Sequence, residues 1–221
     1  MTKGRPNPAC IVKVGEGRGF VIEHDADMAN LRQLQKKERL PKHVSIRLVV
    51  TAAHCLPELP KPHAWGDVDR VYQNLLGTLD TRNTTVWAEC VFADPVADIA
   101  VLGPVDNQEL FHEAAAYDAF VENAPVLRIG NARSGIGWIL ALDGQWIPTT
   151  LEVFSNICGV SLWIGPTEAG MSGSPILNHA GRAVGVVVVG TERVSKSGER
   201  TNEWTGPQAI LAHALPAWLA P

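Results

Sequence analysis

Short apolar stretches separated by turn-forming residues run along most of the chain. They are rich in Val, Ile and Leu, are bounded by Gly, Pro, Asp or Asn, and are too short for helices of several turns, a pattern that predicts strands. The expected strands cover residues 9–14, 19–23, 45–51, 68–76, 84–92, 99–102, 125–130, 137–142, 144–148, 151–154, 161–164, 175–178 and 181–190. Many short strands joined by turns favour an all-β fold, either a barrel or a sandwich.

Three segments have a different pattern. Residues 24–42 are charged, lack glycine and space their apolar side chains as a helix does, so we expect a helical or irregular insertion between two strands. A solvated surface element is the plain interpretation of this charged insertion, and docking of a partner or regulation is the functional one. A short helix is expected over 109–120, and a C-terminal helix over 207–219 although Pro216 lies inside it.

Composition and charge exclude several kinds of partner. The chain has 221 residues, 46% of them hydrophobic, which is enough for one large domain or two small ones. Its formal net charge of -4 gives no basic excess, so neither nucleic acid nor a membrane surface is an expected partner. The first residues are polar and show no signal peptide, and the longest apolar run, near 183–189, is too short to span a bilayer. We therefore expect a soluble, cytoplasmic protein.

Cysteine and histidine spacing indicates no metal site. The cysteines form no Cys-x-x-Cys pair and the histidines show no ligand spacing, so we expect neither a metal nor another cofactor. Two disulfides are arithmetically allowed. Without a secretory signal we favour buried free thiols at Cys10, Cys55, Cys90 and Cys158.

Three short motifs carry candidate chemistry. Val-Val-Thr-Ala-Ala-His-Cys ends an apolar strand in small residues beside His54, which leaves room around an imidazole. Ala-Asp-Ile-Ala-Val-Leu puts Asp98 at the head of a buried strand, where a carboxylate needs a donor such as an imidazole N–H. Gly-Met-Ser-Gly-Ser-Pro places Ser172 in a glycine-flanked turn that can direct successive N–H groups into one concavity. Taken singly, each motif has a plain alternative: a structural histidine, a turn-capping aspartate and a tight turn.

In the order His, Asp, Ser, these motifs resemble those of trypsin/chymotrypsin-like serine peptidases. The resemblance extends over most of residues 9–190 and includes Gly-Phe-Val-Ile in the strand before the histidine strand. It implies one peptidase domain of two packed antiparallel β-barrels, with a catalytic triad in the cleft between them. Residues 1–110 would form the barrel that carries the histidine and the aspartate, and residues 111–221 the barrel that carries the serine and the terminal helix.

The resemblance also implies a role for each motif residue. Ser172 would be the nucleophile, His54 the general base and then the general acid, and Asp98 the group that holds the imidazole tautomer. The backbone N–H groups of Gly170 and Ser172 would form the oxyanion hole.

Three residues in or near these motifs are not expected to take part in catalysis. Ser174 matches a packing position of the family, and Asp94 lies in an Asp-Pro turn dipeptide. Cys55 does not form a dyad with the adjacent histidine, because neighbours on an extended segment point apart. In secreted relatives this cysteine pairs with one shortly upstream. Here only Cys10 lies upstream, so the resemblance does not carry that disulfide over.

Met171 bears on activation. In digestive and clotting members of the family, the residue before the nucleophile is an Asp that pairs with an N-terminus released by zymogen cleavage. Met171 cannot accept an ammonium group, so we expect no such activation, and the chain resembles bacterial and viral relatives more. Many relatives also have a serine that supports the triad aspartate in the strand after the nucleophile. Residues 186–189 offer none, so Asp98 must find other donors.

The expected substrate-binding residues predict only a preference. They are Pro166, Thr167, Val188, Val189 and Gly190. Pro166 stands where Arg/Lys-cleaving relatives have Asp, and Thr167 matches a Thr of Glu-specific relatives whose partner histidine is missing here. The apolar valines of this set would form a pocket wall that favours a small or medium aliphatic P1 residue. A basic P1 residue near Glu168 is the lesser alternative.

Three functions fit these observations. The first is an active serine endopeptidase acting on a protein or peptide substrate. The second is a catalytically silent module that binds peptide segments in the same cleft, against which the complete set of triad residue types argues. The third, compatible with the first, is a protease held latent until a regulatory protein partner, a larger assembly or an effector acts.

Overall fold

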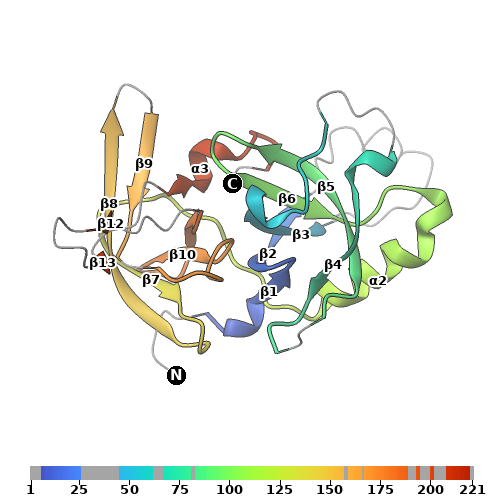
Figure 1. Cartoon of the computed structure of the whole chain (residues 1–221), viewed down its shortest axis with the longest axis horizontal. Helices are drawn as coiled ribbons and strands as arrows, with labels where there is room; N and C mark the ends of the chain where they lie inside the picture. Colours follow the sequence, from blue (N-terminus) through green and yellow to red (C-terminus); the bar gives the residue numbers. More distant parts are fainter. Residues whose placement is uncertain are drawn as a thin grey trace.

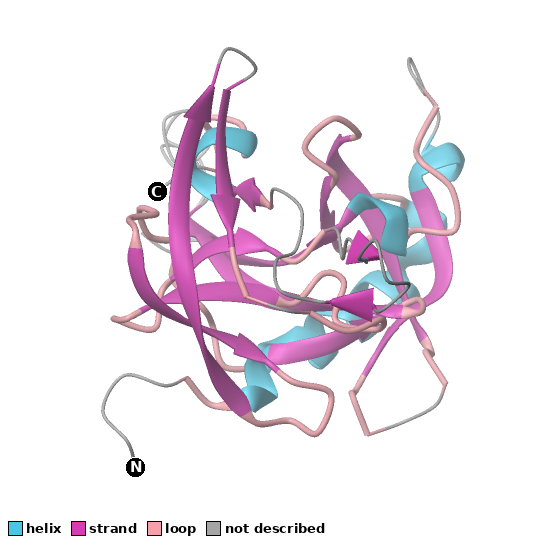
Figure 2. Ribbon diagram, turned by 60° about the vertical axis from the view of Figure 1, so that its left-hand side comes forward, coloured by secondary structure: helices cyan, strands magenta, loops and turns pink. Residues whose placement is uncertain are grey.

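The computed structural model describes residues 6–25, 45–61, 67–80, 83–156, 159–165, 167–188, 193–194, 200–201 and 208–219. Two six-stranded antiparallel sheets lie side by side, one closed into a barrel and the other nearly closed (Figure 1). Strand dominates and the helices are short (Figure 2). The predicted double-barrel fold class is therefore confirmed. All but the first two residues of the predicted insertion at 24–42 lie outside the described residues.

The first barrel is closed in the strand order β1-β2-β3-β6-β5-β4. Its strands are β1 (Ile11–Val14), β2 (Gly17–Asp25), β3 (Ser45–Ala52), β4 (Val71–Gly77), β5 (Val86–Asp94) and β6 (Ile99–Gly103). Short 3₁₀ helices cover Pro8–Cys10, Ala53–Cys55 and Asp67–Arg70. Val50 pairs with both Phe20 and Val101, and all three side chains are fully buried in the core. β-Branched and aromatic residues that fill a closed interior explain why the expected strands form.

The second sheet has the order β14-β11-β10-β7-β8-β9. Its strands are β7 (Gly135–Leu140), β8 (Trp146–Asn156), β9 (Gly159–Trp163), β10 (Pro175–Asn178), β11 (Ala183–Val186) and β14 (Ala209–Ile210). Leu162 in β9 and Gln208 exchange two backbone hydrogen bonds, of 3.0 and 2.7 Å, which bring β9 to the end of β14 and nearly close the sheet. A separate small ribbon pairs β12 (Arg193–Val194) with β13 (Arg200–Thr201).

The connection between the sheets contains the expected helix. A 3₁₀ turn at Gln108–Leu110 leads into α2 (Phe111–Glu122). The fully buried Tyr117 donates its hydroxyl proton to the Leu102 carbonyl at 2.9 Å, and the Arg47 guanidinium donates to the Val121 carbonyl at 2.8 Å. These bonds hold α2 against the first barrel (Figure 1).

Three sequence predictions need correction. The separate strands expected at 144–148 and 151–154 are one strand, β8, because the β-branched Thr149 and Thr150 continue the pairing with β7. The segment expected as a strand at 125–130 lies outside any strand and forms a single bridge, from Ile129 to Ala183. Of the described residues in the strand expected at 181–190, only those of β11 pair as a strand. Val187 and Val188 follow β11 outside any strand.

The expected C-terminal helix over 207–219 is much shorter. Only α3 (Leu211–Ala214) is helical, and β14 just before it pairs with β11. Pro216 disfavours helical geometry at the preceding residue, and Leu215 is extended. Among the described residues, no helix is both long enough and apolar enough to cross a membrane.

Candidate active site

The histidine and aspartate motifs lie side by side at one end of the first barrel. β3 runs directly into the 3₁₀ helix that carries His54, and Asp98 immediately precedes β6. Pairing of Ala52 with Ile99 aligns these two strand ends, and the Ala53 N–H donates to the Asp98 carbonyl at 3.0 Å. The sheet register therefore brings together two residues that are far apart in sequence.

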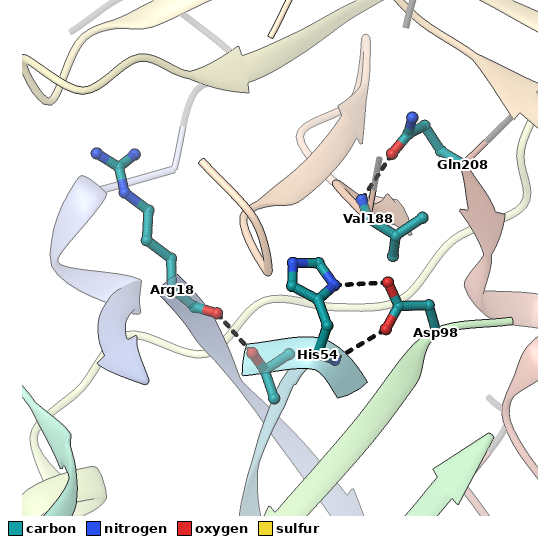
Figure 3. Close-up of polar contacts among 6 residues, drawn as sticks. Arg18, His54, Asp98, Val188 and Gln208 are labelled. Carbon is teal, nitrogen blue, oxygen red and sulfur yellow. Dashed lines mark hydrogen bonds and ion pairs between the residues drawn. The ribbon is translucent and has the colours of Figure 1, made fainter. Parts of the chain in front are cut away.

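The Asp98 carboxylate holds the histidine at two points. One oxygen, Oδ2, lies 2.6 Å from His54 Nδ1, and Oδ1 accepts the His54 backbone N–H at 2.9 Å (Figure 3). Because an ionised carboxylate only accepts, Nδ1 carries the proton and Nε2 keeps a lone pair for base chemistry. The His54 side chain is 46% exposed and that of Asp98 25%, so the ring is open to a substrate while the carboxylate is more covered.

Asp98 has a left-handed backbone with φ +54°. Aspartate tolerates this region better than most residues, because its short side chain can hydrogen-bond locally. The backbone N–H of His54 is the additional donor that Asp98 was expected to need in place of the family's serine.

Ser172 lies in a tight loop between two left-handed glycines, Gly170 (φ +91°) and Gly173 (φ +81°). The Ser174 N–H closes the turn onto the Met171 carbonyl at 2.9 Å, and the Gly173 N–H donates to the Val187 carbonyl at 2.8 Å. The glycine-flanked turn expected from the motif is thus present.

One pocket of about 450 Å³ contains the candidate residues from both barrels. It is lined by His54, Cys55, Gly170 and Ser172, together with Gly15, Glu16, Gly17, Leu56 and Pro57. Within the described part of the chain, the Ser172 hydroxyl and the His54 ring are not hydrogen-bonded, and the N–H groups of Gly170 and Ser172 donate to no other residue. The pocket therefore brings together an imidazole, a hydroxyl and the two residues whose N–H groups are the candidate oxyanion donors. Catalytic hydrogen bonds often tighten only when substrate is bound.

Sequence comparison agrees with the double-barrel fold. The sequence model of the trypsin-like peptidase domain family matches residues 17–186. The chain belongs to this family. No curated protein matches it in sequence.

Three solved structures illustrate what this trypsin-like peptidase domain is similar to. The inactive form of the Rv3671c protease of M. tuberculosis is 18% identical, with 92% of this chain and 84% of that chain covered and a TM-score of 0.47. A human pathogenic astrovirus serine protease is 16% identical, with 99% and 97% covered and a TM-score of 0.49. A Yersinia pestis serine endoprotease is 15% identical, with 95% and 61% covered and a TM-score of 0.49.

Met171, the residue before the candidate nucleophile, is part of the core of the second barrel. Its side chain is 1% exposed and belongs to an apolar cluster that includes Ile139 and Ile164. Its sulfur accepts the Glu168 backbone N–H at 3.1 Å. In this peptidase domain the position is thus occupied by a packed thioether, which offers an ammonium group no carboxylate partner.

The two residues set aside from the motifs have other environments. Asp94 accepts the N–H groups of Val96 and Ala97 at 2.9 and 3.0 Å and so caps a turn. Ser174 is fully buried, and its hydroxyl has no hydrogen-bond partner among the described residues. Neither residue lines the candidate catalytic pocket.

Cys10, Cys55 and Cys90 are buried free thiols, and Cys158 lies outside the described residues. A side chain added at Gly17 would begin against the Cys55 sulfur, so a residue of β2 that faces this thiol is glycine and not a second cysteine. No motif in the sequence marked this contact.

Only part of the expected substrate-binding set can be placed. Thr167 and Val188 are 8% and 7% exposed, whereas Pro166, Val189 and Gly190 lie outside the described residues. The Val188 N–H donates to the side-chain oxygen of the buried Gln208 at 2.7 Å (Figure 3). Gln208 was missed from the sequence because it lies outside every motif and contacts Val188 only through the fold.

Proposed function

We propose that this trypsin-like peptidase domain is a serine endopeptidase that hydrolyses protein or peptide substrates through His54, Asp98 and Ser172. The observation that carries the proposal is the Asp98 carboxylate holding His54 through both Nδ1 and the backbone N–H, beside the pocket that contains Ser172. This arrangement fixes the tautomer that a general base needs.

In the proposed reaction, the Ser172 oxygen attacks the scissile carbonyl while His54 Nε2 takes the hydroxyl proton. The tetrahedral oxyanion accepts hydrogen bonds from the N–H groups of Gly170 and Ser172. His54 then returns the proton to the leaving amine, the C–N bond breaks, and an acyl-enzyme remains on Ser172. A water that gives its proton to His54 attacks the ester, and the serine hydroxyl is restored as the acid product leaves.

The proposed specificity follows from the expected substrate-binding residues, which would contact the part of the substrate before the scissile bond. The P1 pocket would have the apolar Val188 and the short Thr167 in its wall, so it would accept small or medium aliphatic side chains. Pro166, Val189 and Gly190 complete the proposed set. Because an apolar pocket discriminates by about 1–3 kcal/mol per methylene, the preference is graded rather than absolute. The exposed Glu168 is the group that a basic P1 residue would use instead.

The proposed control of activity does not use zymogen cleavage. The packed thioether of Met171 supports this part of the proposal, because it offers a released N-terminus no partner. The proposal includes a latent form, in which a regulatory partner or effector draws Ser172 and His54 together. A cytoplasmic location belongs to the same proposal, because an intracellular protease needs such control.

A fluorophosphonate probe tests the proposal without knowledge of the substrate. The probe phosphonylates a serine only when a base and an oxyanion hole are assembled. We expect the parent to be labelled, either alone or once cell lysate supplies the effector, Ser172→Ala to lose all labelling, and Ser174→Ala, the matched control in the same loop, to keep it. Labelling that survives in Ser172→Ala would refute the assigned nucleophile. A folded parent that stays unlabelled, alone and with cell lysate, would favour the catalytically silent peptide-binding module.

A further inference from the structure

Arg18 is a buried cation where the two barrels meet. Its side chain is 7% exposed and extends from β2 of the first barrel, and its Nη1 donates to the carbonyls of Leu140 and Ala141 at 3.1 Å each. Among the described residues, no carboxylate forms an ion pair with it. Burial lowers the pKa of Arg18 from its ordinary value, yet a guanidinium stays charged in proteins. A buried charge is costly, so a cation whose partners among the described residues are carbonyls calls for a reason.

The backbone of Arg18 is bonded to the loop of the candidate nucleophile. Its N–H donates to the Ser172 carbonyl at 2.8 Å, and its own carbonyl accepts the Thr51 hydroxyl at 2.7 Å. Figure 3 shows the Arg18 side chain leading away from His54, toward the other barrel. One residue therefore fixes the Ser172 main chain through its backbone and the end of β7 through its side chain.

The turn between β7 and β8, at whose start two carbonyls accept from the Arg18 side chain, forms part of a second pocket, of about 510 Å³. The turn between β7 and β8 contributes Leu142, Asp143 and Gly144 to this pocket, and Arg18 lines it as well. Gly17 and Gly170 line both this pocket and the catalytic pocket, so the two adjoin. Leu142 Cδ2 lies 3.5 Å from the point where a side chain on Gly170 would begin. The turn held by Arg18 thus packs against one of the proposed oxyanion donors.

Thr167 and Val188, the described residues of the proposed P1 pocket, line neither the second pocket nor the catalytic pocket. In the proposed function the acyl portion of the substrate occupies the P1 pocket, so the second pocket, which adjoins the catalytic pocket at Gly17 and Gly170, is left for the other end of the peptide. The residues that follow the scissile bond would then enter the pocket beside Arg18.

We propose that Arg18 is a positioning residue for the leaving-group side of the substrate. Its guanidinium holds the β7–β8 turn against Gly170 and so shapes the second pocket, which receives the peptide segment after the scissile bond. This inference rests on the proposed serine-peptidase function.

The test compares two substrates that share an aliphatic P1 residue. One has aminomethylcoumarin as its leaving group, and the other is an internally quenched peptide that continues for several residues beyond the scissile bond. Arg18→Met removes the charge and the donors but keeps the backbone bond to Ser172. We expect it to lower kcat/KM for the extended peptide by roughly tenfold, with little change for the coumarin substrate or for fluorophosphonate labelling. Arg18→Lys, which can still donate to one carbonyl, should recover part of the loss.

Arg47→Met is the matched control, because the Arg47 guanidinium also donates to backbone carbonyls, but at the end of α2. It should leave the ratio of the two kcat/KM values unchanged. An equal loss for both substrates in Arg18→Met would overturn the inference, since a merely structural role lowers both alike. A parent that neither labels nor cleaves, alone and with cell lysate, would instead refute the proposed function.

Hydrogen exchange tests the same contact without catalysis. The Ala141 N–H donates to the Gln145 carbonyl and the Gly144 N–H to the Ala141 carbonyl within the turn that Arg18 holds. Arg18→Met should speed exchange at these two amides, whereas Arg47→Met should not. Unchanged exchange in Arg18→Met would overturn the inference even in an inactive protein.

Discussion

At the scale of single residues, Asp94 and Asp98 show how context separates two identical side chains. Asp94 accepts two N–H groups of its own turn, at 2.9 and 3.0 Å. Asp98 has a left-handed backbone, and its two oxygens accept one bond each from the ring and the backbone of His54. The first arrangement stabilises a turn, whereas the second orients an imidazole and leaves Nε2 available.

Replacing each aspartate by asparagine separates these roles. In Asp98→Asn, an amide NH₂ facing Nδ1 would shift the ring proton to Nε2, which could then no longer accept the proton of Ser172. We expect kcat/KM to fall by about 10⁴-fold, the size of this effect in the family's template enzyme. Asp94→Asn keeps an acceptor oxygen for its turn and should retain activity within about twofold. Steady-state kinetics and labelling rates measure both, and full activity in Asp98→Asn would contradict the proposed role.

At the scale of elements, the start of β2 and the nucleophile loop touch through their backbones. A side chain on Gly17 would begin 2.9 Å from the Ser172 carbonyl, and one on Gly173 would begin 1.7 Å from the Arg18 carbonyl. The Arg18 N–H bond to Ser172 lies between these two contacts. Glycine is needed here because two main chains from different barrels approach so closely.

Gly173→Ala tests how tightly the two elements are joined. Gly144→Ala is the matched control, since the two glycines have φ of +81° and +80°. An added Cβ would clash with a neighbouring atom only at Gly173 of these two. Both variants carry the cost of a left-handed alanine, about 1–2 kcal/mol. We expect Gly173→Ala to lose clearly more free energy of unfolding than Gly144→Ala in urea titrations, and to lose fluorophosphonate labelling as well. Equal losses of stability in the two variants would show that the loop yields without disturbing β2.

The same elements show what the sequence can predict. Strands β3 and β6 match their expected ranges closely, and the motif residues His54, Asp98 and Ser172 lie in short local patterns. The features that the sequence did not predict depend on partners far away in the sequence. The Arg18 side chain binds carbonyls 122 and 123 residues away, so no local pattern could mark it. β14 replaced the start of the expected helix because its partner, β11, is available only in the folded sheet.

At the scale of the whole molecule, burial of thiols links the fold to pH. Cys10, Cys55 and Cys90 all belong to the larger hydrophobic cluster of the structure. Burial raises the pKa of Cys10 from 9.0 to about 12 and that of Cys90 from 9.0 to about 11, and it also raises the pKa of Cys55. In each case removal from water disfavours the thiolate.

The folded protein should therefore lose stability in alkali. Above pH 9 the thiols of the unfolded chain release protons, while those of the folded chain keep theirs until about pH 11 for Cys90 and about pH 12 for Cys10. The folded state then binds more protons, so the free energy of unfolding falls as pH rises, by up to about 1.4 kcal/mol per pH unit for each thiol. Urea titrations under reducing conditions between about pH 8 and about pH 10 measure this slope. Cys10→Ala should have a shallower slope than the parent whatever its starting stability, and an unchanged slope would mean that Cys10 ionises equally in both states.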